Sequence, residues 1–591
     1  MEKVAPCTLF FKIMVFQPYK NKYKIVIIRV EIRLNFKNLT IICIMKKTQN
    51  DTMIKFKIQE NNGYLVLDDF PDNCIFNKVK TGCGATTNAI ENAIDYVIAV
   101  PTTELVENKC FPQKDRDGEN VIWPKRQKKA GVSPVNENLF ALYGEFNQQV
   151  KIELKSFLKK SGKKKIICTY DKIEKLLATI NPQEFKILID EYHNLLKLYS
   201  FRDKAIDGVM NSFKKFRAYC FLSATPIPQD LMPEIFQGIP QYIAEWKSEE
   251  QITVYPYHTD KPCMIASKII VKYKLNGYLT VNGEKSHEAY FFINSVREIA
   301  NILKQSQLTN DECRIICAEN LQNKKKLEGF DISSSTDTPK MFNFITSKSF
   351  EGVDYYSETG LCFVISNTQK THTLISIDMD IPQIAGRIRT RSNPFKNKLV
   401  HIYNTPIFTR YKTYDIIKNE VENDIKAAKE RASIFNGDTL TPDARKQQIE
   451  DVKKLGNESY LRYIDNRFEV NDMVGKLKLY SYIIGKLIYL SDDSLRKYYS
   501  NAGILTAKGK QWEVAPKSVV ENLIKNPQFR DSLRRFCQIM STDNGSILQK
   551  EELLEIQARY PFLEEGYKKL GVKVLKKLKS IKSIKRELSI A

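Results

Sequence analysis

Short aliphatic runs that end in polar residues recur along the chain, and no other feature constrains its fold as strongly. Between residues 54 and 245, stretches with helical spacing, such as Thr87–Ala93 and Lys172–Leu177, separate four of these runs. The four runs are Tyr96–Val100, Lys165–Cys168, Ile187–Ile189 and Tyr219–Leu222. A continuous aliphatic run is typical of a strand buried on both faces, and strands that alternate with helices form βαβ units. The pattern predicts a parallel sheet covered by helices.

A second series of such runs begins after residue 262. Before the first run of this series, Asn276-Gly277 and Asn282-Gly283 carry the strongest short signal for a turn between two strands, so we expect a β-hairpin there. We therefore expect the α/β fold class, with one parallel-sheet domain over residues 54–245, a linker over 246–261 and a second domain over 262–408. The expected strands of the second domain are Tyr290–Asn294, Arg314–Cys317, Phe342–Thr346, Cys362–Ser366 and Leu399–Tyr403.

The first 53 residues stand apart from this pattern. Their apolar runs, such as Lys24–Val30 and Asn38–Met45, are broken by Lys and Arg and do not resemble a signal peptide with its small-residue cleavage site. We interpret residues 1–53 as an N-terminal extension that need not be native, with Met45 or Met53 as the functional start. An additional β element is the alternative.

The chain changes character again beyond residue 409. Long polar stretches with few glycines, such as Asp415–Ala432, predict a mostly α-helical, basic C-terminal region over residues 409–591. In Tyr567–Arg586, lysines flank apolar residues at helical spacing. This stretch fits a solvated helix with an apolar core face, a helix that follows phosphate groups or, with least support, a membrane-surface helix.

Size and composition narrow the class of protein. A chain of 591 residues is too long for one core and predicts two to four domains. Its 92 Lys and Arg against 69 Asp and Glu give a formal charge of +23, which favours a polyanionic partner, although solubility alone also explains a charged surface. No apolar run approaches the ~18 residues that span a bilayer. The 12 cysteines form no C-x-x-C pair and the 5 histidines are dispersed, so we expect reduced cysteines, no zinc site and a cytoplasmic location.

Two adjacent acids follow one of the predicted buried strands. Ile187–Ile189 leads directly into Asp190 and Glu191, with Tyr192 and His193 behind them. In parallel α/β sheets, ligands bind beyond the carboxyl ends of the strands. One carboxylate there can hold Mg²⁺ while its neighbour faces a nucleophilic water, although acids after strands are also common as solvated loop residues.

A glycine-rich loop, Thr81–Thr87, opens the first expected helix with the sequence TGCGATT. Gly82 and Gly84 would let backbone N–H groups surround a phosphate, and Thr86 carries a hydroxyl suited to Mg²⁺. A full P-loop has Lys where this chain has Ala85. In isolation the loop is more typical of an ordinary glycine turn. The acidic strand that follows at the spacing of one nucleotide-binding domain favours the phosphate loop.

Hydroxyl and arginine side chains gather at further strand ends. Val100–Thr103, Cys168–Tyr170 and Phe221–Pro226 each place hydroxyls after a strand, where they contact phosphate groups or simply form turns. In the second domain, Gln383–Arg391 holds three arginines within five residues. Such a cluster is either a solvated turn or a clamp whose planar guanidinium groups fit a transferring phosphoryl group.

The order of these pieces resembles the superfamily 2 helicases of the DEAD/DEAH-like group, over about residues 78–405. The form of Gln383–Arg391 is similar to that of viral origin-binding and phage replication helicases. In chain order, the pieces that resemble motifs I, Ia, Ib, II, III, IV, V and VI are Thr81–Thr87, Val100–Leu105, Cys168–Asp171, Asp190–His193, Ser223–Pro226, Phe291–Ser295, Thr346–Asp354 and Gln383–Arg391.

The resemblance implies two RecA-like domains that bind ATP and Mg²⁺ between them. It implies that Thr86 and Asp190 hold Mg²⁺, that Glu191 orients the attacking water and that Arg387 stabilises the γ-phosphate. The family's final arginine falls at Thr390, and we take Arg389 in its place. The implied catalytic residues are Asp190, Glu191, Gln383, Arg387 and Arg389. The implied nucleotide-binding residues are Lys80, Thr81, Gly82, Cys83, Gly84, Ala85, Thr86, Thr87, Gly352 and Asp354.

Two more sets of residues follow from the same resemblance. Those implied to couple hydrolysis to domain movement are His193, Ser223, Ala224 and Thr225. Those implied to contact nucleic acid are Pro101, Thr102, Thr169, Ser295, Thr346 and Ser347. The implied partners are single-stranded or forked DNA, with RNA as the alternative, and replication proteins.

Ala85 is the departure that matters most for activity, because the missing lysine normally neutralises charge on the β- and γ-phosphates. Either Lys80 or Lys78 replaces it, or the protein binds nucleotide with little turnover. The acids and Arg387 favour hydrolysis. The hypothesis is therefore a phage-type, ATP-dependent helicase or translocase in DNA replication. The alternatives are a hydrolysis-impaired clamp that recruits replication partners, and a helicase–nuclease fusion.

Overall fold

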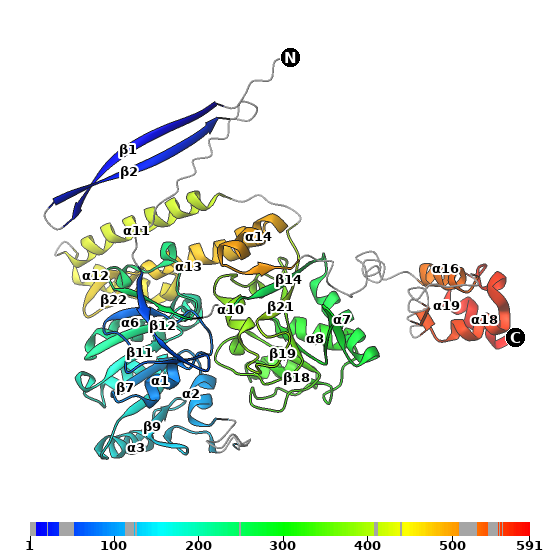
Figure 1. Ribbon diagram of the computed structural model, residues 1–591, viewed down its shortest axis with the longest axis horizontal. Coiled ribbons are helices and arrows are strands. Elements are labelled where there is room, and N and C mark those ends of the chain that lie inside the picture. Colours follow the sequence, from blue (N-terminus) through cyan, green and yellow to red (C-terminus); the bar gives the residue numbers. More distant parts are fainter. Residues whose placement is uncertain are drawn as a thin grey trace. The chain divides into compact units, whose positions relative to one another are not determined.

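Figure 1 shows the computed structural model as a ribbon. The structure describes side chains for most of residues 53–590 and the backbone alone for residues 7–19 and 22–34. The described parts beyond residue 52 are 53–112, 123, 127–247, 250–406, 412–437, 440–507, 529–541, 553–554, 556–557, 560–578 and 580–590. The chain divides into two units, Met1–Lys55 and Phe56–Ala591. In the first unit, β1 (Cys7–Tyr19) and β2 (Lys22–Leu34) form an antiparallel pair that includes the run Lys24–Val30. The run Asn38–Met45 lies outside the described residues.

The first large sheet lies in the first part of the second unit and has the strand order β3-β13-β6-β12-β11-β7-β10-β9-β8. Every neighbouring pair from β13 to β9 is parallel, and β8 pairs with β9 in the antiparallel direction. The strands are β3 (Ile54–Lys57), β6 (Cys74–Asn77), β7 (Tyr96–Val100), β8 (Gly131–Ser133), β9 (Asn136–Leu142), β10 (Lys165–Thr169), β11 (Lys186–Asp190), β12 (Ala218–Ser223) and β13 (Gln241–Glu245). The four strands predicted from aliphatic runs are therefore confirmed as β7, β10, β11 and β12.

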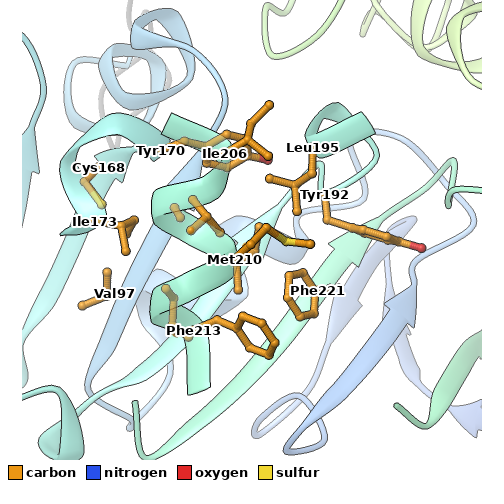
Figure 2. Close-up of a cluster of buried hydrophobic side chains, with 14 of the residues drawn as sticks. Val97, Cys168, Tyr170, Ile173, Tyr192, Leu195, Ile206, Met210, Phe213 and Phe221 are labelled. Carbon is orange, nitrogen blue, oxygen red and sulfur yellow. The ribbon is translucent and has the colours of Figure 1, made fainter. Parts of the chain in front are cut away.

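Helices cover both faces of this sheet, which explains why its central strands are aliphatic throughout. Alternate side chains of one strand enter two different cores: Ile187 and Ile189 of β11 join one, while Leu188 joins the other. Figure 2 shows the first core, in which Ile206 and Met210 of helix α6 (Tyr199–Ser212) lie over the sheet. The other helices of this domain include α1 (Ala85–Glu91), α2 (Thr103–Cys110), α3 (Gln148–Lys159), α4 (Ile173–Leu177) and α5 (Asn194–Lys197).

Phe213 anchors the end of α6 in this core, and its loss should measurably destabilise the domain. Its ring is fully buried and contacts the rings of Tyr219 and Phe221 edge to face, at centroid distances of 4.7 and 5.0 Å (Figure 2). We expect Phe213→Ala to lower the free energy of unfolding by about 3–5 kcal/mol, because the cavity adds to the lost transfer energy. Urea titration followed by circular dichroism measures the shift of the first transition.

Phe201 provides the matched control, because it lies on the same helix with its side chain 83% exposed. Phe201→Ala should move the transition by less than about 0.5 kcal/mol. Equal shifts for the two variants would contradict the packing described above.

The second large sheet has the strand order β18-β19-β17-β20-β21-β14-β24, and each neighbouring pair is parallel. The expected strands of this domain are confirmed, with shifts of one or two residues. The strands are β14 (Thr253–His258), β17 (Glu288–Phe292), β18 (Cys313–Ile316), β19 (Phe342–Ile345), β20 (Gly360–Ser366), β21 (Lys398–Tyr403) and β24 (Leu505–Thr506). With the first sheet and the helices that follow, this confirms the predicted α/β fold class.

β14 lies in the stretch expected to be a linker. Its Val254 and Tyr255 are buried, and it pairs with β21 along its whole length. Pro256 made the stretch resemble a loop, because proline lacks the N–H that a central strand needs. In the described residues, β24 pairs with Thr253 and Val254 only, ahead of Pro256, so the proline lies where that side of β14 has no partner strand.

The two Asn-Gly dipeptides have different roles. Asn282 and Gly283 have φ of 53° and 81° and join β15 (Leu279–Val281) to β16 (Glu284–Ser286), as the hairpin prediction requires. Asn276 instead ends helix α7 (Pro262–Asn276), and Gly277 adopts φ of 76° at its C-cap. Both turns need positive φ, so the dipeptide alone does not distinguish a hairpin from a helix end.

The described residues beyond 409 are mostly helical and include a β-hairpin. They form α11 (Tyr414–Asn436), α12 (Pro442–Leu455), β22 (Leu461–Ile464), β23 (Arg467–Val470), α13 (Asp472–Tyr482), α14 (Asp492–Asn501), α16 (Phe529–Ile539), α18 (Phe562–Leu575) and α19 (Ile581–Ile590). Among all the described residues, no helix combines the length and the apolar composition required to cross a membrane.

The segment from α13 to α14 packs against both large sheets. Met473 and Leu479 of α13 join the core that contains β11, whereas Leu495 and Tyr499 of α14 join a core of the second domain. Six of the residues between these helices, Ile483–Ile488, form a π-helical turn. The C-terminal region therefore connects the two domains through buried apolar contacts.

Candidate active site between the two domains

The two acids after β11 are both buried. Asp190 is 1% exposed and Glu191 is 7% exposed, so both carboxylates need partners. Glu191 adopts φ of 52°, a left-handed conformation that is uncommon for a residue with a side chain. The Tyr170 hydroxyl donates to the Asp190 carbonyl at 2.7 Å and the Glu191 amide donates to the Asp190 carboxylate at 3.0 Å, which holds this turn in place.

Two groups reach these acids, one from the glycine loop and one from the end of β6. The Thr86 hydroxyl donates to Asp190 Oδ2 at 2.6 Å. Lys78 Nζ lies 3.2 Å from Asp190 Oδ1 and 2.8 Å from Glu191 Oε1. Burial alone would lower the pKa of Lys78, but the two carboxylates outweigh it and raise that pKa above its usual value. The ammonium is therefore charged at neutral pH.

Lys80 takes a different direction from Lys78. Its Nζ lies 4.3 Å from the centre of the Trp246 ring, and the Trp246 indole N–H donates to the Lys78 carbonyl at 2.9 Å. Of the two lysines considered as substitutes, the structure brings Lys78 to the acids.

The glycine loop itself has the conformation that its sequence predicted. Gly82 and Gly84 adopt φ of 64° and 78°, and Gly84 is the N-cap residue of α1. A Cβ atom on Gly82 would lie 1.9 Å from Nη1 of Arg389, a residue of the second domain. Only glycine therefore allows the guanidinium group to lie directly on the loop.

Gly386 makes the reciprocal contact. A Cβ atom there would lie 1.9 Å from the Thr81 hydroxyl oxygen, so the segment after α10 (Asp380–Ala385) touches the loop closely. Arg389 Nε also donates to Asp354 Oδ1 at 2.7 Å. Burial alone would raise the pKa of Asp354, but Arg389 and Arg387 outweigh it and hold that pKa below its usual value.

Gln383 connects the second domain directly to Glu191. Its side-chain amide donates to Glu191 Oε2 at 3.1 Å and to the Thr225 hydroxyl at 3.2 Å. Arg387 in turn donates from Nη2 to the Gln383 side-chain oxygen at 3.1 Å and from Nη1 to the Val353 carbonyl at 3.1 Å. Arg387 thus reaches the acid through Gln383. Burial, followed by the neighbouring Arg389, lowers the pKa of Arg387 from its usual value.

A buried polar network runs from the site to the interface of the two domains. His193 Nδ1 lies 2.8 Å from the Ser223 hydroxyl, and His193 Nε2 lies 3.1 Å from Glu351 Oε1. Lys197 Nζ completes the network with contacts of 2.5 Å to Glu351 and 2.6 Å to Asp380. Burial alone would raise the pKa of Glu351, but Lys197 and His193 hold it well below its usual value.

Sequence reasoning missed three members of this network: Lys197, Glu351 and Asp380. Glu351 lies inside the recognised stretch Thr346–Asp354 and could have been singled out there. Lys197 and Asp380 gave no signal, because each lies in an ordinary helical pattern.

The hydroxyls expected to contact nucleic acid have local partners. Thr102 and Ser295 accept hydrogen bonds from backbone amides as N-caps of α2 and α8 (Val296–Gln305). Thr346 donates to the Ile316 carbonyl at 3.2 Å and Ser347 to Asn294 Oδ1 at 2.6 Å. Thr169 is buried at the end of β10, and the Pro101 carbonyl accepts a hydrogen bond from Arg202. These local contacts explain the positions of the six residues without any bound nucleic acid. A role of the six residues in nucleic-acid binding therefore stays a prediction.

The remaining predicted residues lie around the loop. Cys83 and Ala85 are buried, and the Thr87 hydroxyl accepts a hydrogen bond from Lys109 Nζ at 2.9 Å. Ala224 lies between Ser223 and Thr225 in the chain and is also buried. Gly352 contacts the first domain, since a Cβ atom there would lie 2.2 Å from Leu105 Cγ. The structure thus brings the glycine loop, the acids and the Gln383–Arg391 segment together at one site.

Comparisons with known proteins give distant similarities in fold. No protein-family model matches the chain, and no curated protein matches it. Among solved structures it is similar to Dbp5 of S. cerevisiae bound to RNA and ADP BeF3, at 11% identity and a TM-score of 0.35, over 60% of this chain and 83% of that one. A DEAD box protein of Methanococcus jannaschii gives 13% identity and a TM-score of 0.25, over 56% and 82% of the two chains. The yeast DEAD-box splicing factor Prp28 gives 16% identity and a TM-score of 0.20, over 60% and 75%.

Proposed function

We propose that the chain is an ATP-dependent nucleic-acid helicase or translocase. The observation that carries the proposal is the contact between the domains, in which the Gln383 amide of one meets the Glu191 carboxylate of the other at 3.1 Å. Arg389 lies on the glycine loop of the first domain at the same place. Phosphoryl transfer requires an acid and guanidinium groups on either side of a phosphate loop. Here the acid comes from one domain and the guanidinium groups come from the other.

The donor set around Asp190 fits Mg²⁺. Thr86 and Asp190 offer a hydroxyl and a carboxylate, and hard oxygen ligands of this kind are what the ion prefers. When bound, Mg²⁺ would neutralise charge on the phosphates. Thr86 and Asp190 would hold it, and the glycine loop would surround the phosphate oxygens with backbone N–H groups.

Glu191 is positioned to accept a proton from the attacking water. Gln383 orients its carboxylate, and Arg389 on the loop stabilises the negative charge of the transferring γ-phosphoryl group. Arg387 reaches the same group or holds Gln383 in place. Because Gln383 also contacts Thr225, loss of the γ-phosphate would alter the contacts from Glu191 through Thr225 to His193 and Glu351. This network would transmit hydrolysis to the relative movement of the domains.

The experiment that tests the proposal measures phosphate release from ATP by the full chain, alone and with single-stranded DNA or RNA. We expect release that either polymer stimulates, and binding that weakens steeply with salt because phosphate contacts dominate. Stimulation by DNA alone would support the finer assignment to DNA replication, which rests on the form of Gln383–Arg391. Salt-dependent binding without phosphate release would select the clamp that recruits partners and would refute the helicase.

A further inference from the structure

The phosphate loop lacks a lysine at position 85, and the acids nevertheless have a buried ammonium group between them. Lys78 Nζ contacts Asp190 at 3.2 Å and Glu191 at 2.8 Å. Asp190 also accepts the hydrogen bond from the Thr86 hydroxyl at 2.6 Å. The ammonium therefore lies one hydrogen bond from each acid that frames the triphosphate site. This is the neighbourhood that a P-loop lysine occupies, but the side chain enters from the end of β6.

The backbone around Lys78 is held in a costly conformation that fixes this direction. Val79, a β-branched residue, adopts φ of 63°, which is a rare and strained conformation for such a side chain. Four hydrogen bonds hold it. Asn77 Oδ1 accepts from the Val79 amide at 2.8 Å, and the Ser223 carbonyl accepts from the Lys78 amide at 2.9 Å. The Lys78 carbonyl accepts from the Lys80 amide at 2.7 Å and from the Trp246 indole N–H at 2.9 Å. Val79 itself is exposed, so apolar burial does not explain the strain.

Two other lysines near the loop have different partners. Lys80 lies over the Trp246 ring, and Lys109 of α2 donates to the Thr87 hydroxyl. Lys78, by contrast, is buried and contacts both acids.

We propose that Lys78 is the phosphate-binding lysine of this site and replaces the lysine that Ala85 displaces from the loop. The proposal rests on the proposed ATPase function. It assigns the positive charge that binds the β- and γ-phosphates to a residue that precedes the glycine loop. Without nucleotide, the ammonium pairs with Asp190 and Glu191. With Mg²⁺ held by Asp190 and Thr86, Lys78 would be free to leave the acids and to donate its ammonium hydrogens to the phosphate oxygens.

The test compares Lys78→Met with Lys80→Met and Lys109→Met in the full chain, with Lys155→Met as the matched control. Lys155 is an exposed residue of α3, remote from the loop in sequence and in contacts. We expect Lys78→Met to lower phosphate release by roughly 10²- to 10³-fold, as loss of a positioned charge on a developing anion does. The decrease in phosphate release should be at least about tenfold larger for Lys78→Met than for Lys80→Met or Lys109→Met. Phosphate release by Lys155→Met should equal that of the parent.

A second measurement covers the case in which two unpaired buried acids prevent Lys78→Met from folding. In the double variant Lys78→Met/Glu191→Gln, one of these acids is replaced by a neutral side chain. The affinity of the double variant for a fluorescent ATP analogue with Mg²⁺ is compared with the affinity of Glu191→Gln. We expect the double variant to bind at least about tenfold more weakly, because the charge on the phosphates has lost its partner. Equal affinities would overturn the assignment of Lys78.

The outcomes separate this inference from the proposed function. Parent-like hydrolysis by Lys78→Met, with Glu191→Gln inactive, refutes the role of Lys78 and leaves the ATPase standing. An inactive parent whose nucleotide binding still depends on Lys78 refutes the ATPase and supports the clamp. A parent that neither hydrolyses nor binds nucleotide refutes both. Restoration of hydrolysis by Ala85→Lys in the Lys78→Met background would add direct support for the exchange of positions.

Discussion

Glu191→Gln should lower ATP turnover by roughly two to four orders of magnitude, because a positioned general base contributes about that much. The substitution keeps the size of the side chain and its ability to contact Gln383, whose amide lies 3.1 Å from Glu191 Oε2. It removes the charge that would accept the proton of the attacking water. Nucleotide affinity should change by only a few-fold, since the phosphates are held by the loop. Single-turnover phosphate release and titration with a fluorescent ATP analogue measure the two quantities separately.

Glu137→Gln is the matched control, because Glu137 is an exposed residue of β9 in the same domain. Its turnover should equal that of the parent. Unchanged, nucleic-acid-stimulated turnover in Glu191→Gln would show that another group activates the water, and the assignment of the acid after β11 would have to be abandoned.

Arg389→Ala should lower kcat by about three orders of magnitude, the scale on which a guanidinium clamp stabilises a transferring phosphoryl group. The guanidinium group lies on Gly82 and pairs with Asp354 at 2.7 Å, so Asp354 holds it in place over the loop. Arg389→Lys should recover little of the loss, because a point charge cannot make the paired hydrogen bonds of the planar group. Steady-state kinetics with saturating nucleic acid measures kcat and KM.

Arg391→Ala is the informative comparison. Its guanidinium carbon lies 5.7 Å from the centre of the Tyr64 ring, and it donates to the Asn62 carbonyl, so it belongs to the edge of the site. We expect a change in KM for ATP with kcat within a few-fold of the parent. A larger loss of kcat at position 391 than at 389 would reverse the assignment of the second arginine.

The fold was predictable because its signal lies in local sequence. Buried parallel strands need continuous aliphatic runs, and β7, β10, β11 and β12 all have them. Strands whose runs are short or polar at one end escaped prediction: β6 is CIFN, and β9 begins with Asn136, Glu137 and Asn138. β14 escaped because Pro256 interrupts it. The sequence could not show that the neighbouring edge strand ends before that proline.

The candidate site was predictable where chemistry and position coincide in the sequence. Asp190, Glu191 and the glycine loop each follow a strand at the same edge of the sheet, so the topology brings them together. The choice between Lys78 and Lys80 depended on the φ of Val79 and on the position of Trp246, which neither local pattern nor charge reveals. The contact of Lys197 with Glu351 joins residues 154 apart, beyond the reach of any local rule.

The apolar bridge formed by α13 and α14 has a mechanical consequence for any motor cycle. One end of it is anchored in the core beneath β11 and the other in the core of the second sheet, with the π-helical turn Ile483–Ile488 between them. In the proposed motor, domains joined in this way would stay tethered to each other after nucleotide leaves. Each cycle of that motor would then be a rotation about this link, and its amplitude would depend on how far the π-helical turn bends.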